Sequence, residues 1–395
     1  MNSEMLEFAQ KLIRKKDKEI DLKDPIMIVY KVTGACNLSC QYCYQNQKYS
    51  DKQVSINDII KFVDFISTQK RGYIYVAFHG GEPMLQDKRI IVIIEELLKR
   101  KYAKRIRFSL QTNGTICSER LFDLCKDKHV TIGISIDGFN RQANKCRLGN
   151  HDADEYFCKL KNTISYLNEH EIDFSVITVL NRNNFERIDE IMGFLVQYKV
   201  KTWSCNDLVD NENIEDKQII LTAEEKLAAY KRIVEYLLNF NKRVNPYNRI
   251  YETNIRQWLS TITETNNYVY DICGTHPCGL FSHTLSIECD GTVFPCDMML
   301  SKEYKVLNIQ KFSENEYYDF INRKEKLDFE CSRKCVEQCE GRSICKINCK
   351  AINISGVHRE YFCKLYIPLY DYLQTIANVK NNLELLNPTM GKRNL

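Results

Sequence analysis

The sequence predicts an α/β fold in which a parallel sheet is followed by a cysteine-rich region. Between Ile26 and about Phe240, short apolar runs rich in β-forming residues alternate with stretches of helical periodicity. This alternation is typical of a parallel sheet covered by helices. After residue 240 the alternation stops, and cysteines crowd together between Cys273 and Cys363. A chain of 395 residues is long for one ordinary domain and suggests two or three.

The strands and helices of the first part can be placed in order. Apolar runs bounded by turn residues predict strands at Ile26 to Val32, Tyr73 to Phe78, Arg105 to Leu110, Val130 to Ile136, Phe174 to Val179 and Lys201 to Ser204. Helical periodicity predicts helices at Ile56 to Ile66, Lys88 to Arg100, Glu119 to Cys125, Glu155 to Leu167, Phe185 to Tyr198 and Ala223 to Asn239. In parallel βα folds, ligands bind at the carboxyl ends of the strands.

Composition divides the chain into three segments. Residues 1–25 are expected to form an N-terminal helical extension, residues 26–240 the βα region, and residues 241–395 the cysteine-rich part with a C-terminal helix. The second boundary is placed near residues 241–247, because this stretch is polar and contains Pro246.

Charge and hydropathy exclude several classes of protein. Lys and Arg number 56 against 52 Asp and Glu, a net charge of +4 without a basic stripe, so no nucleic-acid partner is expected. No apolar run approaches the ~18 residues of a membrane span, and the N-terminus lacks the apolar core of an export signal. A cytoplasmic location follows, in which the 18 cysteines are expected to be reduced thiols and metal ligands.

Three cysteines form the most specific motif of the chain. Cys36, Cys40 and Cys43 have Cys-x3-Cys-x2-Cys spacing directly after the first predicted strand. Three thiolates on one loop can ligate three corners of a [4Fe–4S] cube, which leaves one iron open to another ligand. A zinc site is the alternative, but structural zinc takes four ligands, usually in paired knuckles, and no second knuckle lies near.

This loop, with Tyr42 before its last cysteine and His79-Gly80-Gly81-Glu82-Pro83 after the second predicted strand, resembles the radical S-adenosylmethionine (SAM) superfamily. The resemblance implies an open, partial (β/α)6 TIM-like barrel. It also implies that the amino and carboxylate groups of SAM chelate the open iron. Reductive cleavage of SAM then gives a 5′-deoxyadenosyl radical, which abstracts hydrogen from a substrate.

The same resemblance assigns a SAM pocket. Gly80 and Gly81 let the backbone approach a ligand, and Glu82 pairs with the methionine ammonium; a plain turn is the alternative. Asn113 in Gln-Thr-Asn-Gly follows the third strand, and Ser135 and Asp137 in Ser-Ile-Asp-Gly follow the fourth. In relatives, residues that correspond to Ser135 and Arg147 contact the ribose and carboxylate of SAM. Turn caps and a surface arginine are the alternative for these single positions.

A second block of ten cysteines between residues 273 and 363 is too dense to be core filling. It resembles the SPASM extension, which carries two auxiliary [4Fe–4S] clusters and would bring the total to three. The resemblance implies two sets of ligands, Cys273, Cys278, Cys296 and Cys349 for the first and Cys335, Cys339, Cys345 and Cys363 for the second. Cys331 is spare, so either it or Cys335 is the ligand, and paired zinc ribbons remain an alternative.

The remaining cysteines fit no ligand position. Cys289 lies at an expected hairpin turn, in Glu-Cys-Asp-Gly. We interpret it and five others as buried or incidental thiols: Cys117, Cys125, Cys146, Cys158 and Cys205.

Enzymes with the SPASM extension modify peptides or proteins. Asp297, directly after Cys296, matches the aspartate proposed as general base in anaerobic sulfatase-maturating enzymes, which make formylglycine from Cys or Ser; alternatively it only orients its loop. His79 stands where those relatives typically have Gln, which favours maturases of ribosomally made peptides (RiPPs) that form thioether or cyclophane-type crosslinks. A SPASM enzyme acting on a small molecule and a non-catalytic iron–sulfur electron carrier are further hypotheses.

The expected partners follow from this chemistry. They are a peptide or protein substrate and an external electron donor such as a flavodoxin or a ferredoxin-like protein. Residues Met1 to Pro25 are too few for a folded leader-recognition module, so a leader peptide is expected to bind elsewhere or through a separate protein.

Overall fold

The computed structural model describes residues 21, 24–45, 52–208, 210, 214–263, 283–300, 304–322, 339–345, 349 and 359–387. Within them, one ten-stranded sheet has the order β10-β9-β8-β1-β2-β3-β4-β5-β6-β7. The first predicted segment, residues 1–25, lies largely outside this part of the chain. So do Cys273, Cys278, Cys331 and Cys335.

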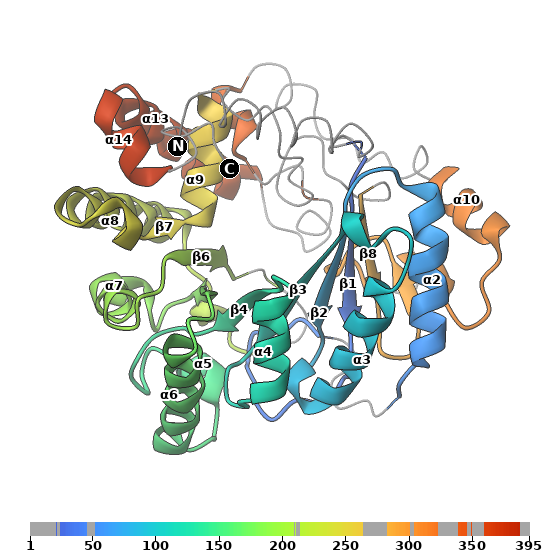
Figure 1. The fold of residues 1–395 in the computed structure, drawn as a ribbon. Coiled ribbons are helices and arrows are strands. Elements are labelled where there is room, and N and C mark those ends of the chain that lie inside the picture. The colour runs from blue at the N-terminus through green and yellow to red at the C-terminus, as the bar shows by residue number, and fades with distance from the viewer. Residues whose placement is uncertain are drawn as a thin grey trace, which may run out of the picture.

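The strands β1 to β6 confirm the predicted parallel sheet. They pair in sequence order and all in parallel, at Ile26–Lys31, Ile74–His79, Ile106–Thr112, Thr131–Ser135, Phe174–Leu180 and Thr202–Asp207. The sheet curves, and its helices lie along the outer side of the curve (Figure 1). The fold is therefore the α/β partial barrel expected from the sequence.

The helices of the barrel also lie where periodicity predicts them. They are α2 (Ile56–Gln69), α3 (Asp87–Leu98), α4 (Glu119–Asp127), α6 (Ala153–Glu169), α7 (Ile188–Gln197) and α8 (Ala223–Arg243). Side-chain caps fix the starts of α6 and α8: Asp152 accepts from the backbone of Glu155, and Thr222 forms a capping box with Glu225. Phe185–Arg187 is a 3-10 turn before α7, so that predicted helix begins three residues late.

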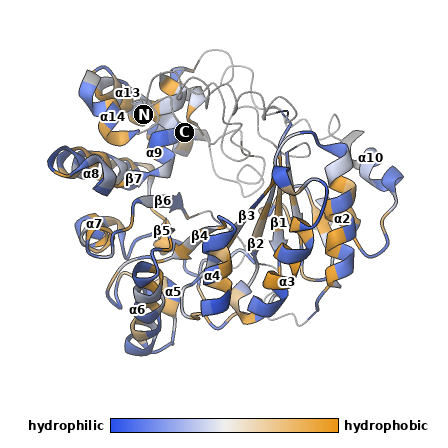
Figure 2. Cartoon of the chain, viewed as in Figure 1, coloured by the Kyte–Doolittle hydropathy of each residue, from blue (hydrophilic) through white to orange (hydrophobic). Residues whose placement is uncertain are grey.

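Alternation along each strand separates a helix-facing side from an inner side. In β1, Ile26, Ile28 and Tyr30 are buried beneath the helices. Lys31 is the last residue of β1 and pairs in register with His79 at the end of β2. The apolar faces of the outer helices turn toward the sheet and their polar faces turn away (Figure 2). The main core thus lies between sheet and helices, and the inner side is left for polar groups.

The sheet continues into the C-terminal part of the chain. β8 (Thr284–Ile287) pairs in parallel with β1 and forms an antiparallel hairpin with β9 (Thr292–Phe294), which pairs with β10 (Leu307–Asn308). At the opposite edge, β7 (Tyr251–Glu252) pairs in parallel with β6. Residues on both sides of the boundary placed at 241–247 therefore share one sheet.

Five further helices complete the described part. They are α5 (Lys145–Leu148), α9 (Thr253–Ile262), α10 (Glu314–Asn322), α13 (Arg359–Ala377) and α14 (Lys380–Leu386). Near α10, Phe312 makes an edge contact with Phe62 of α2, with ring centroids 5.4 Å apart. Among the described residues, no helix is both long and apolar enough to cross a membrane.

Candidate functional site

The loop after β2 packs directly on the start of the cysteine loop. The backbone amide of Gly81 donates to the carbonyl of Thr33 at 2.8 Å, and that of Glu82 donates to the carbonyl of Ala35 at 2.8 Å. A Cβ on Gly80, whose φ is +133°, would lie 2.4 Å from the Thr33 oxygen, and one on Gly81 would lie 2.0 Å from the Ala35 oxygen. Both glycines are thus required by the neighbouring backbone that leads into the cysteine loop.

We expect Gly81→Ala to damage the cysteine loop. A Cβ this close to a carbonyl oxygen forces a backbone shift, and such overpacking costs about 1–3 kcal/mol. The unfolding temperature and the iron content of the reconstituted protein should both fall. Gly193→Ala is the matched control, because a Cβ there meets nothing within 4 Å and its helix position favours Ala. Equal unfolding temperatures for the two variants would contradict this account of the glycine.

The thiols of Cys36, Cys40 and Cys43 share one electrostatic environment. Burial raises the pKa of Cys36, and it raises the pKa of Cys40 to about 12; in both cases neighbouring thiolates act in the same direction and Arg147 opposes them. Ligating thiolates therefore need a cation beside them. Within the described ranges no three His, Cys, Asp or Glu side chains are arranged to hold one metal ion. Three thiols on one loop are the number of protein ligands that a [4Fe–4S] cube with one open iron requires.

Glu82 is held by both of its carboxylate oxygens. Oε1 accepts from Thr112 Oγ1 at 2.6 Å and from the amide of Met84 at 3.0 Å, and Oε2 accepts from the amide of Asn113 at 2.7 Å. The side chain is 1% exposed. Burial raises the pKa of Glu82 to about 6, although these hydrogen bonds lower it. The carboxylate is therefore ionised at neutral pH and fixed at the end of the sheet.

Asn113 connects the loop after β3 to the cysteine loop. Its Nδ2 donates to Asn37 Oδ1 at 2.8 Å, and its Oδ1 accepts from the amide of Thr115 at 2.9 Å. Asn37 Nδ2 in turn donates to Thr115 Oγ1 at 2.8 Å. These bonds fix the orientation of the residue that follows Cys36.

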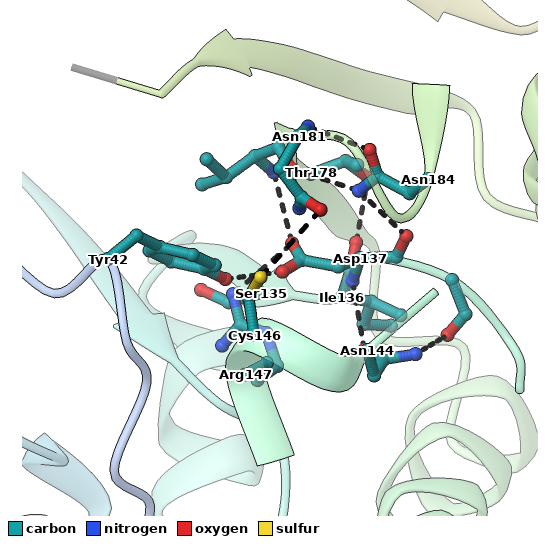
Figure 3. A network of polar contacts seen from close by, with 12 residues as sticks. Tyr42, Ser135, Ile136, Asp137, Asn144, Cys146, Arg147, Thr178, Asn181 and Asn184 are labelled. Carbon is teal, nitrogen blue, oxygen red and sulfur yellow. Dashed lines mark hydrogen bonds and ion pairs between the residues drawn. The ribbon is translucent and has the colours of Figure 1, made fainter. Parts of the chain in front are cut away.

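Asp137 organises a network between the cysteine loop and α5 (Figure 3). Its Oδ2 accepts from the hydroxyl of Tyr42, and its Oδ1 accepts from the amide of Val179 at 3.0 Å. Arg147 Nη2 lies 3.5 Å from the same Oδ1, and its guanidinium lies 5.9 Å from the centroid of the Tyr42 ring. Asp137 is fully buried. Its contacts place Tyr42 and Arg147 side by side.

The surroundings of Asp137 are held by amides. Asn144 accepts from the Asp137 amide at 3.3 Å and donates to the Gly138 carbonyl at 2.6 Å, while Asn184 donates to the Asp137 carbonyl at 3.1 Å. Nearby, Ser135 Oγ accepts from Gln111 Nε2 at 2.7 Å.

Arg147 passes a test for binding an acidic ligand. Its Nε is buried without a hydrogen-bond partner among the described residues. An unpartnered guanidinium N–H costs free energy unless an acceptor such as a carboxylate reaches it. The position therefore fits the carboxylate of SAM.

A second polar group lies where the ends of β1 and β2 meet the segment after β9. Tyr44 donates from its hydroxyl to Asp297 Oδ2 at 2.9 Å, and Lys31 Nζ donates to the Tyr44 oxygen at 3.4 Å. Cys296 Sγ lies 3.6 Å from Asp297 Oδ1. Lys31 is fully buried, whereas Tyr44, His79 and Asp297 are partly exposed.

The charges in this group act on one another. Burial opposes ionisation of Asp297, but the charge of Lys31 and the hydrogen bond from Tyr44 hold the pKa of that carboxyl below its ordinary value. Burial and the charge of Lys31 lower the pKa of His79 to about 3. The imidazole is neutral, and because its Nδ1 accepts from the amide of Gly80 at 2.9 Å, Nε2 carries the proton.

Among the described C-terminal cysteines that are proposed ligands, Cys339, Cys345 and Cys363 lie near α13, whereas Cys296 lies after β9. Cys339 and Cys345 flank a 3-10 turn (Glu340–Ser343), which packs on α13, the helix that carries Cys363. A Cβ on Gly341 in that turn would lie 3.2 Å from the Tyr366 oxygen of α13. Cys296 follows β9, and Cys349 is also described. Cys289 is buried in the turn between β8 and β9, as expected.

Comparison with known proteins identifies the first site. Residues 30–195 match the family model described as the radical SAM superfamily. The chain is a radical SAM enzyme. Its radical SAM region includes the cysteine loop, Glu82, Asp137 and Arg147. The [4Fe–4S] cluster and SAM are accordingly the cofactors of this site.

The similarity extends over nearly the whole chain. The cysteine-type anaerobic sulfatase-maturating enzyme of Clostridium perfringens is 23% identical over 379 residues, which cover 91% of this chain and 99% of that protein. The serine-type enzyme of Bacteroides thetaiotaomicron is 24% identical over 394 residues, with 89% and 90% covered. This radical SAM enzyme therefore resembles peptide-modifying maturases in its C-terminal part as well.

Solved structures show the same fold. The structure of anSMEcpe with bound AdoMet and Cp18Cys peptide matches with a TM-score of 0.73 and 23% identity, covering 90% of this chain and 99% of that one. Streptococcus suis SuiB bound to precursor peptide SuiA matches with a TM-score of 0.64 and 17% identity, covering 91% and 79%.

Sequence reasoning missed several residues of the two polar groups. Lys31 is a charged residue that ends an otherwise apolar strand, which is a signal that could have been used. Thr112 and Asn37 carry no such signal, because short polar residues are common in loops. Tyr44 could have been noticed only by its position next to Cys43.

Proposed function

We propose that this radical SAM enzyme forms a thioether or cyclophane-type crosslink in a ribosomally made peptide. The observation that carries the proposal is the partly exposed carboxylate of Asp297, held by Tyr44 at the end of the barrel beside His79. A carboxylate kept ionised at the rim of a SAM pocket can accept the proton that a crosslinking reaction releases.

The residues around SAM have separate tasks in this proposal. Cys36, Cys40 and Cys43 hold the cluster, which together with SAM supplies the 5′-deoxyadenosyl radical. Glu82 would accept a hydrogen bond from the methionine ammonium, and the unpartnered Nε of Arg147 would donate to the carboxylate of SAM. A larger group lines the remainder of the pocket: Tyr42, His79, Gly80, Gly81, Asn113, Ser135 and Asp137.

Asp297 acts after hydrogen abstraction. Crosslinking removes two hydrogens from the peptide: one is abstracted by the radical, and the other leaves as a proton and an electron. Asp297 accepts the proton, while Lys31 and Tyr44 keep its carboxylate ionised beforehand. The auxiliary clusters, where bound, would accept the electron, and an external flavodoxin or ferredoxin-like partner would exchange electrons with the enzyme and supply the reducing electron for SAM cleavage.

We infer two auxiliary clusters and therefore three in all. Cys273, Cys278, Cys296 and Cys349 would hold the first, and Cys335, Cys339, Cys345 and Cys363 the second, with Cys331 as the alternative to Cys335. The packing of the Cys339–Cys345 turn on the helix of Cys363 supports the second set. The segments 26–240 and 241–395 remain the proposed functional units, in a cytoplasmic enzyme whose peptide substrate is presented directly or by a separate leader-binding protein.

Formylglycine formation is the second candidate function. Similarity to the sulfatase-maturating enzymes of Clostridium and Bacteroides over about nine-tenths of this chain favours it. His79 favours crosslinking, because the resemblance predicts Gln at this position in sulfatase-maturating relatives.

Mass spectrometry separates the two functions. The reconstituted enzyme, SAM and reductant are incubated anaerobically with peptides encoded beside its gene and, separately, with the Cp18Cys peptide. Crosslinking predicts loss of two hydrogens from a neighbouring-gene peptide, a new side-chain linkage in its fragments and no aldehyde. A hydrazide-reactive aldehyde in Cp18Cys would instead establish formylglycine formation and refute the crosslinking proposal.

The pKa of Glu82 predicts how SAM binding depends on pH. Above about 6 the carboxyl is ionised and attracts the ammonium, and below that value it is neutral. The dissociation constant of SAM should therefore be level above neutrality and rise as pH falls through about 6. Equilibrium binding to wild type and Glu82→Gln tests this, because the variant should bind weakly at every pH. A pH-independent wild type would contradict the assigned contact.

A further inference from the structure

Lys31, Tyr44 and Asp297 form a chain of hydrogen bonds with only one direction. A lysine ammonium only donates, and an ionised carboxylate only accepts. The single hydroxyl proton of Tyr44 goes to Asp297 Oδ2 at 2.9 Å, so the phenol oxygen is left to accept from Lys31 Nζ at 3.4 Å. The ammonium also lies 4.9 Å from the centroid of the Tyr44 ring. A buried charge therefore orients the phenol, and the phenol orients the carboxylate.

The chain spans two segments that are far apart in sequence. Tyr44 directly follows Cys43 of the SAM-cluster loop, and Asp297 directly follows Cys296 of the segment after β9. The cysteine loop follows β1, whose last residue is Lys31, and the segment of Asp297 follows β9. β8 lies between these two strands, paired in parallel with β1 and antiparallel with β9. The hydrogen bond between Tyr44 and Asp297 is thus a direct side-chain link between the loop that holds SAM and the segment that holds the proposed proton acceptor.

We propose that Lys31 and Tyr44 are positioning residues that hold the carboxylate of Asp297 in place for the substrate proton. The hydrogen bond from Tyr44 to Oδ2 restrains rotation of the carboxylate, and the residue is partly exposed. The inference rests on the proposed role of Asp297. Beyond that role, Asp297 depends for its position on Tyr44 of the cysteine loop and on the buried ammonium of Lys31.

A double-mutant cycle tests whether Tyr44 acts through Asp297. The measured quantity is the ratio of 5′-deoxyadenosine formed to peptide modified, in the holoenzyme. A hydrogen bond to a charged group is worth about ten- to a hundredfold, so Tyr44→Phe should raise the ratio by that factor, while KM for the peptide changes little. In an Asp297→Asn background the same substitution should change the ratio less than about twofold. A full effect in both backgrounds would overturn the proposal.

Lysine variants test the first link of the chain. Lys31→Met removes the charge at similar length and should raise the ratio as Tyr44→Phe does, whereas Lys31→Arg should restore part of the coupling. Tyr102→Phe is the matched control. It removes a tyrosine hydroxyl that donates to Asp64 of α2 at 2.7 Å, on the helical side of the sheet. If Lys31→Met behaves like the control, Lys31 has no positioning role.

Hydrogen exchange of the holoenzyme gives an answer that needs no substrate. In Tyr44→Phe, amide exchange should rise together in peptides covering residues 38–45 and 292–300, and in Tyr102→Phe it should rise in neither. Unchanged exchange in Tyr44→Phe would overturn the link even if the enzyme modifies peptides as proposed. Failure of the wild type to modify any peptide would refute the proposed function and leave the exchange result to decide the link.

Discussion

Replacing Cys36, Cys40 and Cys43 together with Ala is expected to abolish SAM cleavage and to lower the iron content from about twelve to about eight per chain, since one cube of four would be lost. The three thiols lie on one loop, and the charge of Cys43 contributes to the raised pKa of both Cys36 and Cys40, so the three form one ligand set. Iron and sulfide analysis after anaerobic reconstitution and a 5′-deoxyadenosine assay measure both effects.

The matched control for this experiment removes two exposed cysteines, in the variant Cys117→Ala/Cys158→Ala. It should retain its iron and its SAM cleavage, because neither thiol belongs to a proposed ligand set. Only about four irons in wild type would refute the auxiliary clusters. A fully loaded wild type that cleaves no SAM would instead support an electron carrier.

Asp297→Asn should strongly slow peptide modification while SAM cleavage continues. The amide keeps the shape of the side chain but cannot accept the substrate proton, and loss of general-base catalysis costs about a hundred- to ten-thousandfold. Hydrogen abstraction precedes this step, so deuterium from a labelled peptide should still enter 5′-deoxyadenosine. Mass spectrometry of both products gives the comparison.

Asp297→Glu is the companion variant, since it keeps a carboxylate and should recover part of the modification. Unimpaired modification by Asp297→Asn would mean that this aspartate only orients its loop. Loss of deuterium transfer in the same variant would mean that it acts before or during abstraction.

The barrel could be predicted from sequence because local pattern determines most of it. The runs that begin at Ile26 and Phe174 are apolar along the buried face and bounded by turn residues, which is the signal of a parallel strand. The pairing of β8 with β1 could not be predicted, because Thr284 and Met27 are neighbours only through the register of two distant segments. The same limit explains why a boundary at 241–247 does not interrupt the sheet.

The parts of the candidate site that lie within one short motif could be predicted from the sequence. The spacing of Cys36, Cys40 and Cys43 and the glycines before Glu82 are local constraints, and the sequence displays them. The contacts of Asp137 are different, because Tyr42, Val179 and Arg147 come from three separate parts of the chain. A sequence identifies such a residue as a candidate, and only the fold shows what it holds.

The pairing of β8 with β1 also has a consequence in time. During synthesis the β1 strand emerges early, but its neighbour on one side follows more than 250 residues later. At about 5–20 residues per second this interval is on the order of ten to fifty seconds. Throughout it, the hydrogen-bonding edge of an apolar strand is open to other nascent chains. The ribosome therefore delivers β1 long before β8, the strand that covers its edge.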